Sequence, residues 1–199
     1  MRIRKSAYIL GLFIVFLFLS CNNKQNSFTH DKSRIPSKHL IEMIRIPQND
    51  NYSCATTSAA MIITYYQKLT QPLNKEFIWE LSKTDKESVL KYGNDISGLN
   101  RICDYYNYKH DFKQNMSFDD LHYYLSQNIP IIIFINFDKN HTHATVLNGY
   151  DIDKQVFYVN DPSVEEKEMP ELFLENHWTA WLANPRTDSY RAGYLIYKE

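Results

Sequence analysis

The chain has 199 residues, which suits a single domain with a short leader and allows a sizeable core. Apolar residues make up 44% and charged residues 23%, proportions that are typical of a globular protein and exclude a disordered one. The formal net charge is −1, and no long basic run occurs after the N-terminal segment. Nucleic acid is therefore not an expected partner.

The N-terminal segment has the pattern of an export signal. Arg2, Arg4 and Lys5 form a basic start, and residues 8–19 are all apolar or Gly. This apolar run is shorter than the roughly 20 residues that a membrane-spanning helix needs. Its length is that of the hydrophobic region of a signal peptide.

The signal ends at a cysteine. Phe18-Leu19-Ser20-Cys21 resembles a bacterial lipobox, in which the cysteine is lipidated and becomes the mature N-terminus. We therefore expect a lipoprotein signal peptide at 1–20, lipidation of Cys21, a flexible tether at 21–40 and a folded domain at 41–199. This predicts attachment to the bacterial cell envelope through the lipid. An ordinary signal peptide or an uncleaved anchor is the alternative.

Helical signals fill the first half of the domain. A helix is expected from about Cys54, with one buried face made by Ala55, Ala59, Ile62, Ile63 and Tyr66. Asn74 can cap a second helix whose inward residues are Phe77, Ile78 and Leu81. Residues 93–98 look like a loop in which Ser97 caps a third helix carrying Leu99, Ile102 and Tyr106. Ser117 and Asp120 form a capping box ahead of Leu121, Tyr124 and Leu125.

Strand signals follow. The β-branched run 131–135 after Pro130 predicts a buried strand, and residues 144–150 and 156–159 predict two more around a turn at 151–154. Pro170 favours the first turn of a helix running to about Leu182, and residues 190–197 favour a closing strand. Helices first and mostly antiparallel strands afterwards indicate the α+β class.

Cys54 is the residue with the clearest chemical setting. A helix start carries partial positive charge and free N–H groups, which favour a nucleophilic thiolate. The side-chain amide of Gln48, six residues earlier, is a donor that could stabilise the oxyanion of a tetrahedral intermediate. The Cys54 backbone N–H could supply a second donor.

A base and its orienting acceptor are expected from the strands. His143 heads the strand 144–150 and can reach toward the helix that bears Cys54. Asp161 closes the next strand, and a hairpin between the two strands would bring it close to His143. The chain order is then oxyanion donor, nucleophile, base and orienting acid.

At these residues the chain resembles a known family. Ile46-Pro47-Gln48 with Cys54 opening a helix of small residues is similar to the papain-like cysteine peptidases. His143 followed by Asn148-Gly149-Tyr150-Asp151 and Asn160-Asp161-Pro162 resembles their bacteriocin-processing branch, the double-glycine leader peptidases and their stand-alone relatives. The resemblance covers about residues 44–185. It implies a papain-like fold, with helices bearing the Cys packed on a sheet bearing the His and Asp. That family usually has Gly-Pro directly after the Cys, whereas this chain has Ala55-Thr56, which bears on the oxyanion geometry.

Other roles for these residues remain open. Cys54 could be a buried apolar residue or could pair with Cys103, which itself fits a core position. His141 and His143 could bind zinc together with Asp161. His141 could also be the base, and Asp151 or Asp153 could orient the histidine instead of Asp161.

The leading function is therefore hydrolysis of peptide bonds through a thioester intermediate, on a peptide or protein substrate and without a cofactor. One alternative is a catalytically dead, tethered peptide-binding module. Another is an acyltransferase or deamidase that uses the same residues.

Overall fold

The computed structural model describes residues 35–138, 141–165, 167–184 and 187–198. The expected signal peptide, the lipidation site Cys21 and most of the expected tether lie outside these residues. Among the described residues, no helix is both long enough and apolar enough to cross a bilayer.

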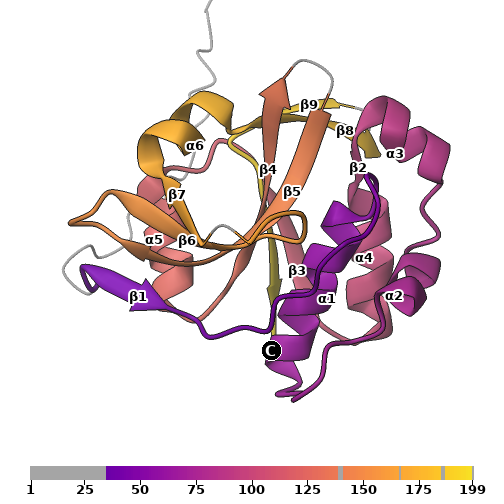
Figure 1. Ribbon diagram of the computed structural model, residues 1–199, viewed down its shortest axis with the longest axis horizontal. Helices are drawn as coiled ribbons and strands as arrows, with labels where there is room; N and C mark the ends of the chain where they lie inside the picture. Colours follow the sequence, from indigo (N-terminus) through magenta and orange to yellow (C-terminus); the bar gives the residue numbers. More distant parts are fainter. Residues whose placement is uncertain (1–34, 139–140, 166, 185–186, 199) are drawn as a thin grey trace, which may run out of the picture.

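Helices cover the two faces of a sheet (Figure 1). One group gathers on the side coloured indigo to magenta: α1 (Cys54–Tyr66), α2 (Lys75–Ser82), α3 (Lys86–Tyr92) and α4 (Ile96–Tyr105). Two further helices pack on the other side: α5 (Phe118–Ser126) and α6 (Glu171–His177).

The main sheet is antiparallel throughout the described pairs. Its strand order is β3 (Lys109–Lys113), β10 (Gly193–Tyr197), β4 (Ile131–Asp138), β5 (His141–Asp151), β6 (Val156–Asn160) and β7 (Glu168–Pro170), and β1 (Lys38–Leu40) also pairs with β5. A smaller sheet contains β2 (Asn94–Asp95), β8 (Thr179–Asn184) and β9 (Thr187–Tyr190). The expected α+β class is confirmed.

The strand β4 is apolar at every early position because both of its faces are buried. Ile132 and Phe134 belong to the core shared with α1 and α4. Ile131, Ile133 and Ile135 belong to a second core shared with α5 and α6. A strand with helices on both sides needs apolar residues at successive positions, which explains the uninterrupted run in the sequence.

The first helix is buried on all sides. It begins at Cys54 as expected, but every residue from Cys54 to Thr64 is buried, so the expectation of a single buried face was wrong. Small residues such as Ala59 and Ala60 let this helix sit between the sheet and the neighbouring helices α2 and α4.

Helix α2 has the predicted N-cap, but its buried residues differ from the predicted ones. Asn74 accepts a hydrogen bond from the Phe77 backbone N–H, which is the expected N-cap. Ile78 is fully buried, whereas Phe77 is 41% exposed and its ring contacts that of Tyr105. The inward placement of Phe77 was therefore wrong.

The segment 93–98 is not a loop. It holds β2 and the first turn of α4, whose N-cap is Asp95 and not Ser97. The Asp95 carboxylate accepts hydrogen bonds from Thr84 and Arg101, so it ties α4 to the end of α2. The helix α3 just before this segment was not expected.

The last expected helix is much shorter than predicted. α6 ends at His177, and residues 179–184 form strand β8 instead of continuing to Leu182. Trp178 closes the helix as a buried residue whose indole N–H donates to the Ala192 carbonyl. The closing strand is likewise divided, since β9 ends at Tyr190 and β10 begins at Gly193.

The strand β1 lies ahead of Ile41, where we expected the domain to begin. It pairs with β5, so that Leu40 lies opposite Gly149. A Cβ atom built on Gly149 would lie 2.4 Å from the His39 carbonyl oxygen and 2.9 Å from the Leu40 Cα. Only glycine allows the two strands to approach this closely.

We predict that Gly149→Ala separates β1 from β5. Overpacking of this kind lowers the free energy of unfolding by about 1–3 kcal/mol, measured by denaturant titration. Hydrogen exchange should show lost protection of the β1 amides. Leu40→Ala, at an exposed side chain of β1, is the control and should change little. Unchanged stability and protection in Gly149→Ala would contradict the prediction.

Candidate active site

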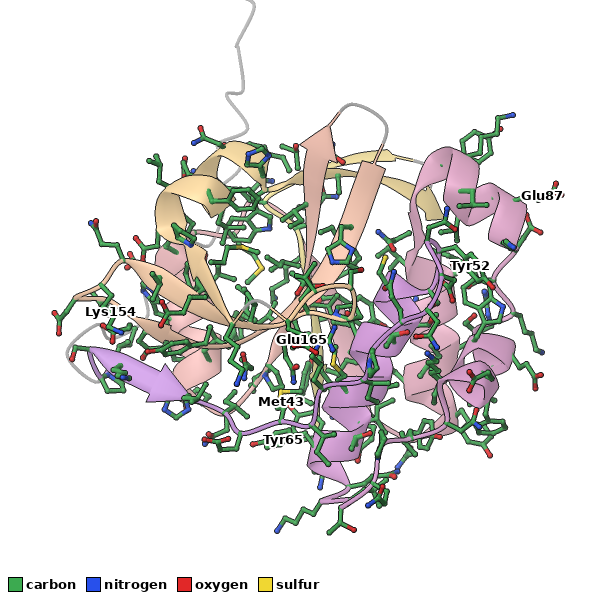
Figure 2. All side chains as sticks on the ribbon, in the orientation of Figure 1. Met43, Tyr52, Tyr65, Glu87, Lys154 and Glu165 are labelled. Atoms are coloured by element: carbon green, nitrogen blue, oxygen red, sulfur yellow. The ribbon has the colours of Figure 1, made fainter. Side chains whose placement is uncertain are left out.

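Cys54 lies in the first turn of α1, which a local turn holds in place. The Asp50 carboxylate accepts hydrogen bonds from the backbone N–H groups of Tyr52 and Ser53 and from the Ser53 hydroxyl. Tyr52 points toward the other helices (Figure 2), where its ring packs on Trp79 with centroids 4.9 Å apart. The segment before the helix is thus anchored on both sides, and Cys54 is 5% exposed.

The two residues after Cys54 preserve the helix start. Ala55 and Thr56 are buried, and the Thr56 hydroxyl donates to the Ser53 carbonyl at 3.0 Å. The first intrahelical hydrogen bond runs from the Thr57 N–H to the same carbonyl at 2.8 Å. Helix α1 therefore begins at Cys54 without the Gly-Pro that the resemblance implied at these two positions.

His143 and Asp161 form a buried pair. His143 Nε2 donates to Asp161 Oδ2 at 2.7 Å, and the two side chains are only 12% and 6% exposed. His143 lies within β5 and not at its first residue, since the strand begins at His141. Asp161 directly follows β6, the neighbour of β5 in the sheet, so the two residues meet through the pairing we expected.

Cys54 is the second partner of His143. Its side chain hydrogen bonds to the imidazole. Because Nε2 faces Asp161, Nδ1 is the ring nitrogen left for the sulfur. The structure thus brings together Cys54, His143 and Asp161, which lie far apart in the sequence.

The pKa values of His143 and Asp161 both differ from the ordinary values of these groups. Burial disfavours the imidazolium, but the hydrogen bonds to Asp161 and Cys54 outweigh it and raise the pKa of His143 to about 10. Burial likewise disfavours the Asp161 carboxylate, but His143 outweighs that effect and the pKa of Asp161 is lowered. The arrangement favours a protonated imidazole beside the Asp161 carboxylate.

Gln48 is connected to this site through the turn before α1. Its side-chain Nε2 donates to the Asp50 carbonyl at 2.7 Å, and Asp50 in turn holds Ser53, the residue before Cys54. Its backbone N–H donates to the Pro162 carbonyl at 2.9 Å, next to Asp161. Since a primary amide has two N–H groups, the bond to Asp50 leaves one hydrogen of Gln48 for another acceptor.

Arg45 is a residue of this site that the sequence did not single out. Its guanidinium donates to the carbonyl oxygens of Asp161 at 2.6 Å, Val164 at 3.1 Å and Pro162 at 3.3 Å. These bonds tie the segment before α1 to the loop after β6. A single arginine in a segment without periodicity carries no local signal of such a role.

Asn94 is a second residue that the sequence analysis missed. Its Oδ1 lies 3.2 Å from the Cys54 sulfur, and its side chain reaches the site from the short strand β2. We found no sequence signal for it, because the segment 93–98 resembled a loop.

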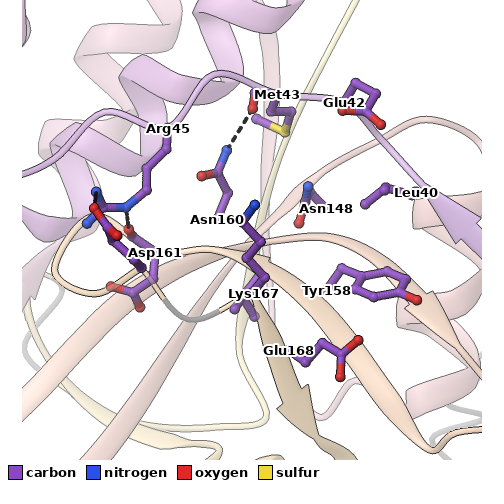
Figure 3. A pocket seen from close by; sticks show the side chains of 12 residues that line it. Leu40, Glu42, Met43, Arg45, Asn148, Tyr158, Asn160, Asp161, Lys167 and Glu168 are labelled. Atoms are coloured by element: carbon purple, nitrogen blue, oxygen red, sulfur yellow. Dashed lines mark hydrogen bonds and ion pairs between the residues drawn. The ribbon is translucent and has the colours of Figure 1, made fainter.

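A cavity of about 660 Å³ borders the acid side of the site (Figure 3). Its walls come from the segment after β1, from β5 and β6, and from the loop before β7; they include Met43, Arg45, Asn148, Asn160, Asp161 and Lys167. Of the described residues, neither Cys54 nor His143 lines it. The cavity therefore adjoins Asp161 without opening on the sulfur.

The described residues do not support the alternative roles considered for Cys54 and Asp151. Cys54 and Cys103 are both unpaired, so no disulfide joins them. Cys103 is a core residue as expected, and burial raises the pKa of its thiol to about 12. Asp151 accepts the Lys154 backbone N–H and pairs with Lys38, as a turn residue does.

The described residues contain no group of three His, Cys, Asp or Glu side chains placed to hold a metal ion. The side chain of His141, the other base considered, lies outside the described part of the structure.

The fold is similar to that of solved cysteine peptidases. A double-glycine motif protease from an AMS/PCAT transporter, solved in complex with the leader peptide, matches with a TM-score of 0.58 and 17% identity over 81% of this chain and 95% of that one. The peptidase domain of Streptococcus ComA, a bifunctional ABC transporter of a quorum-sensing pathway, matches with a TM-score of 0.59 and 17% identity, over 80% of this chain and 99% of that one. Xylellain, a cysteine protease from Xylella fastidiosa, matches with a TM-score of 0.52 and 14% identity, over 87% of this chain and 91% of that one.

The expected papain-like architecture is thus confirmed at the level of the fold. A search of curated proteins found no match. The sequence itself matches a family profile over residues 40–184, most of the described chain. This protein belongs to the Peptidase_C39 like family.

Proposed function

We propose that this protein is a lipid-anchored bacterial cysteine peptidase that hydrolyses peptide bonds with Cys54 as nucleophile, His143 as base and Asp161 as its orienting acid. The observation that carries the proposal is the buried His143, which hydrogen bonds to Asp161 at 2.7 Å on one side and to Cys54 on the other. A thiol, a base and an orienting acid in contact are the parts that nucleophilic catalysis needs.

The first half of the reaction forms a thioester. The Cys54 thiolate attacks the peptide carbonyl carbon, a C–S bond forms, and the carbonyl oxygen becomes an oxyanion. The Cys54 backbone N–H, in the first turn of α1, and the second hydrogen of the Gln48 amide are the proposed donors to this oxygen. The His143 imidazolium then gives its proton to the departing amine as the C–N bond breaks.

The second half releases the acid product. Neutral His143 takes a proton from water, and the resulting hydroxide attacks the thioester carbon. The C–S bond breaks, the new carboxyl group leaves, and the thiolate–imidazolium pair is restored. Asp161 keeps the imidazole in the orientation that both halves need and stabilises its charge.

A peptide substrate is supported by the similar double-glycine motif protease, which was solved with a leader peptide bound. Attachment to the membrane is supported by Ser20-Cys21 at the end of the apolar run. A lipid at Cys21 would hold the domain at the bacterial cell envelope.

We predict that Cys54→Ala and His143→Ala each abolish peptide hydrolysis, by about a thousandfold or more, because the members of a catalytic unit depend on one another. Cleavage of a peptide library followed by mass spectrometry measures this. It also separates hydrolysis from acyl transfer and deamidation, which give other masses. Cys103→Ala is the matched cysteine control and should stay active. Full activity in Cys54→Ala would refute the assignment, and an inactive wild-type protein would favour a binding module.

Asp161→Asn should lower the pKa of His143 from about 10 toward its ordinary value near 6.5, since the carboxylate favours the imidazolium. The alkaline limb of the pH–activity profile should then move to lower pH. NMR titration of the His143 ring should show a pKa lowered by the same amount.

The same pair makes stability depend on pH. A raised histidine pKa contributes stability that is fully present below about 6.5 and is lost as pH rises toward 10. The wild-type protein should therefore lose stability over that window, and Asp161→Asn should lose less. Asp151→Asn, at the last residue of β5, is the control. An unmoved alkaline limb in Asp161→Asn would exclude Asp161 as the orienting acid.

Cys21→Ala should release the protein from the membrane, because the lipid is its proposed anchor. Detergent-phase partitioning of cell fractions measures the change. Cys54→Ala keeps the lipobox and should partition like the wild type. Retention of Cys21→Ala in the detergent phase would show that the anchor is not a lipid at this residue.

A further inference from the structure

Asn94 meets the proposed nucleophile from a different part of the fold. Cys54 lies in the first turn of α1, whereas Asn94 lies in β2, forty positions later in the sequence. Its Oδ1 is 3.2 Å from the Cys54 sulfur, within the range of a hydrogen bond that involves sulfur. Asn94 is 1% exposed, so water does not compete for this contact.

The backbone holds Asn94 firmly at this position. Gly93, just before it, has a φ of 90°, a left-handed conformation that glycine adopts without strain. Asp95, just after it, is bound by Thr84 at 3.0 Å and by Arg101 at 3.2 Å. Asn94 itself pairs with Leu182 of β8. A residue whose backbone is fixed on both sides is suited to orienting another group.

The other end of the Asn94 amide is buried without a partner. Its Nδ2 finds no hydrogen-bond acceptor among the described residues. Leaving a buried donor unpaired costs about 1–3 kcal/mol, so such groups are rare in folded proteins and call for an explanation. Because nothing holds Nδ2, the amide can exchange its O and N ends by turning about χ2 without breaking a bond to another group.

We propose that Asn94 is a positioning residue for the nucleophile, whose amide accepts a hydrogen bond from the Cys54 thiol and, after turning, donates one to the thiolate. This inference rests on the proposed function. The carbonyl end matches S–H, a donor, and the N–H end matches S⁻, an acceptor. No atom is transferred to Asn94, and the thiol proton passes to His143. Turning the amide replaces a repulsive C=O···S⁻ contact by an attractive N–H···S⁻ one.

The contact supplies a donor that the helix start alone does not. His143 holds one side of the sulfur, and the first turn of α1 lies behind it. Asn94 approaches from β2, so the thiolate would have charge-stabilising partners from separate elements. This keeps the sulfur directed while the acyl group binds and leaves.

The test measures the thiol directly and does not need a substrate. The rate of Cys54 alkylation by iodoacetamide is recorded against pH in Cys103→Ala protein, which leaves one cysteine in the folded domain. Asn94→Leu keeps the size of the side chain and removes both ends of the amide. The midpoint of the alkylation profile should rise by about one pH unit, a tenfold change in the ionisation equilibrium. Asn100→Leu is the matched control and should leave the midpoint unchanged. It removes an asparagine whose side chain accepts a hydrogen bond from the Tyr194 hydroxyl.

A second measurement needs no substitution at Asn94. In the ¹⁵N-labelled protein, the Asn94 side-chain NH₂ signal should shift with the same midpoint as Cys54 alkylation, and the shift should vanish in Cys54→Ala. A midpoint that is unchanged or lowered in Asn94→Leu would overturn the proposal, as would an Asn94 signal that ignores the titration. Neither measurement involves peptide cleavage. Failure of this proposal would therefore appear in the alkylation and NMR data, whereas failure of the proposed function would appear as an absence of hydrolysis.

Discussion

The arrangement of the site depends on one connection, between the segment that precedes α1 and the loop that follows β6. The Arg45 guanidinium donates to three backbone carbonyls of that loop, those of Asp161, Pro162 and Val164. Three residues later, the Gln48 N–H donates to Pro162. These bonds attach the start of the helix that bears Cys54 to the loop that carries Asp161. Without them the helical half and the sheet half could pack together and still leave Cys54 and His143 misaligned.

The same loop also satisfies the buried charge at its centre. Asp161 Oδ1 accepts from the backbone N–H groups of Ser163 at 2.7 Å and Val164 at 3.1 Å, and Oδ2 accepts from His143. A buried carboxylate is tolerated when its oxygens are hydrogen-bonded in this way. Removing one partner of a buried ion pair costs about 3–5 kcal/mol, because the other charge is left uncompensated. The hydrogen bonds that hold His143 in place therefore also contribute to the stability of the domain.

The two buried cysteines show how surroundings and not burial alone decide chemistry. Cys103 is fully buried in the helical core beside the Tyr194 hydroxyl, 3.7 Å from its sulfur, and the pKa of its thiol is raised to about 12. Cys54 is almost as buried, yet it lies at a helix start and touches an imidazole and an amide. The two thiols are therefore buried to a similar degree but have different neighbours.

Local patterns in the sequence were enough for much of the framework. The capping box at Ser117 and Asp120, the N-cap at Asn74 and the helix start at Cys54 all follow from neighbours within four residues. The run 131–135 indicated a buried strand because β-branched residues favour the extended backbone. The order of Cys54, His143 and Asp161 along the chain also indicated a cysteine peptidase before any geometry was known.

Tertiary structure decided what depends on contacts between distant residues. Residues 179–184 have a helical pattern ahead of them but pair with β2 and β9, and the β2 partner lies almost ninety positions earlier in the chain. Phe77 has an apolar side chain at a helical inner position, yet it meets Tyr105 at the surface. Arg45 and Asn94 are a charged and a polar residue in segments without periodicity, so nothing local marks them. Their roles exist only because folding brings them to the loop after β6 and to the Cys54 sulfur, and such encounters leave no trace in the spacing of residues along the chain.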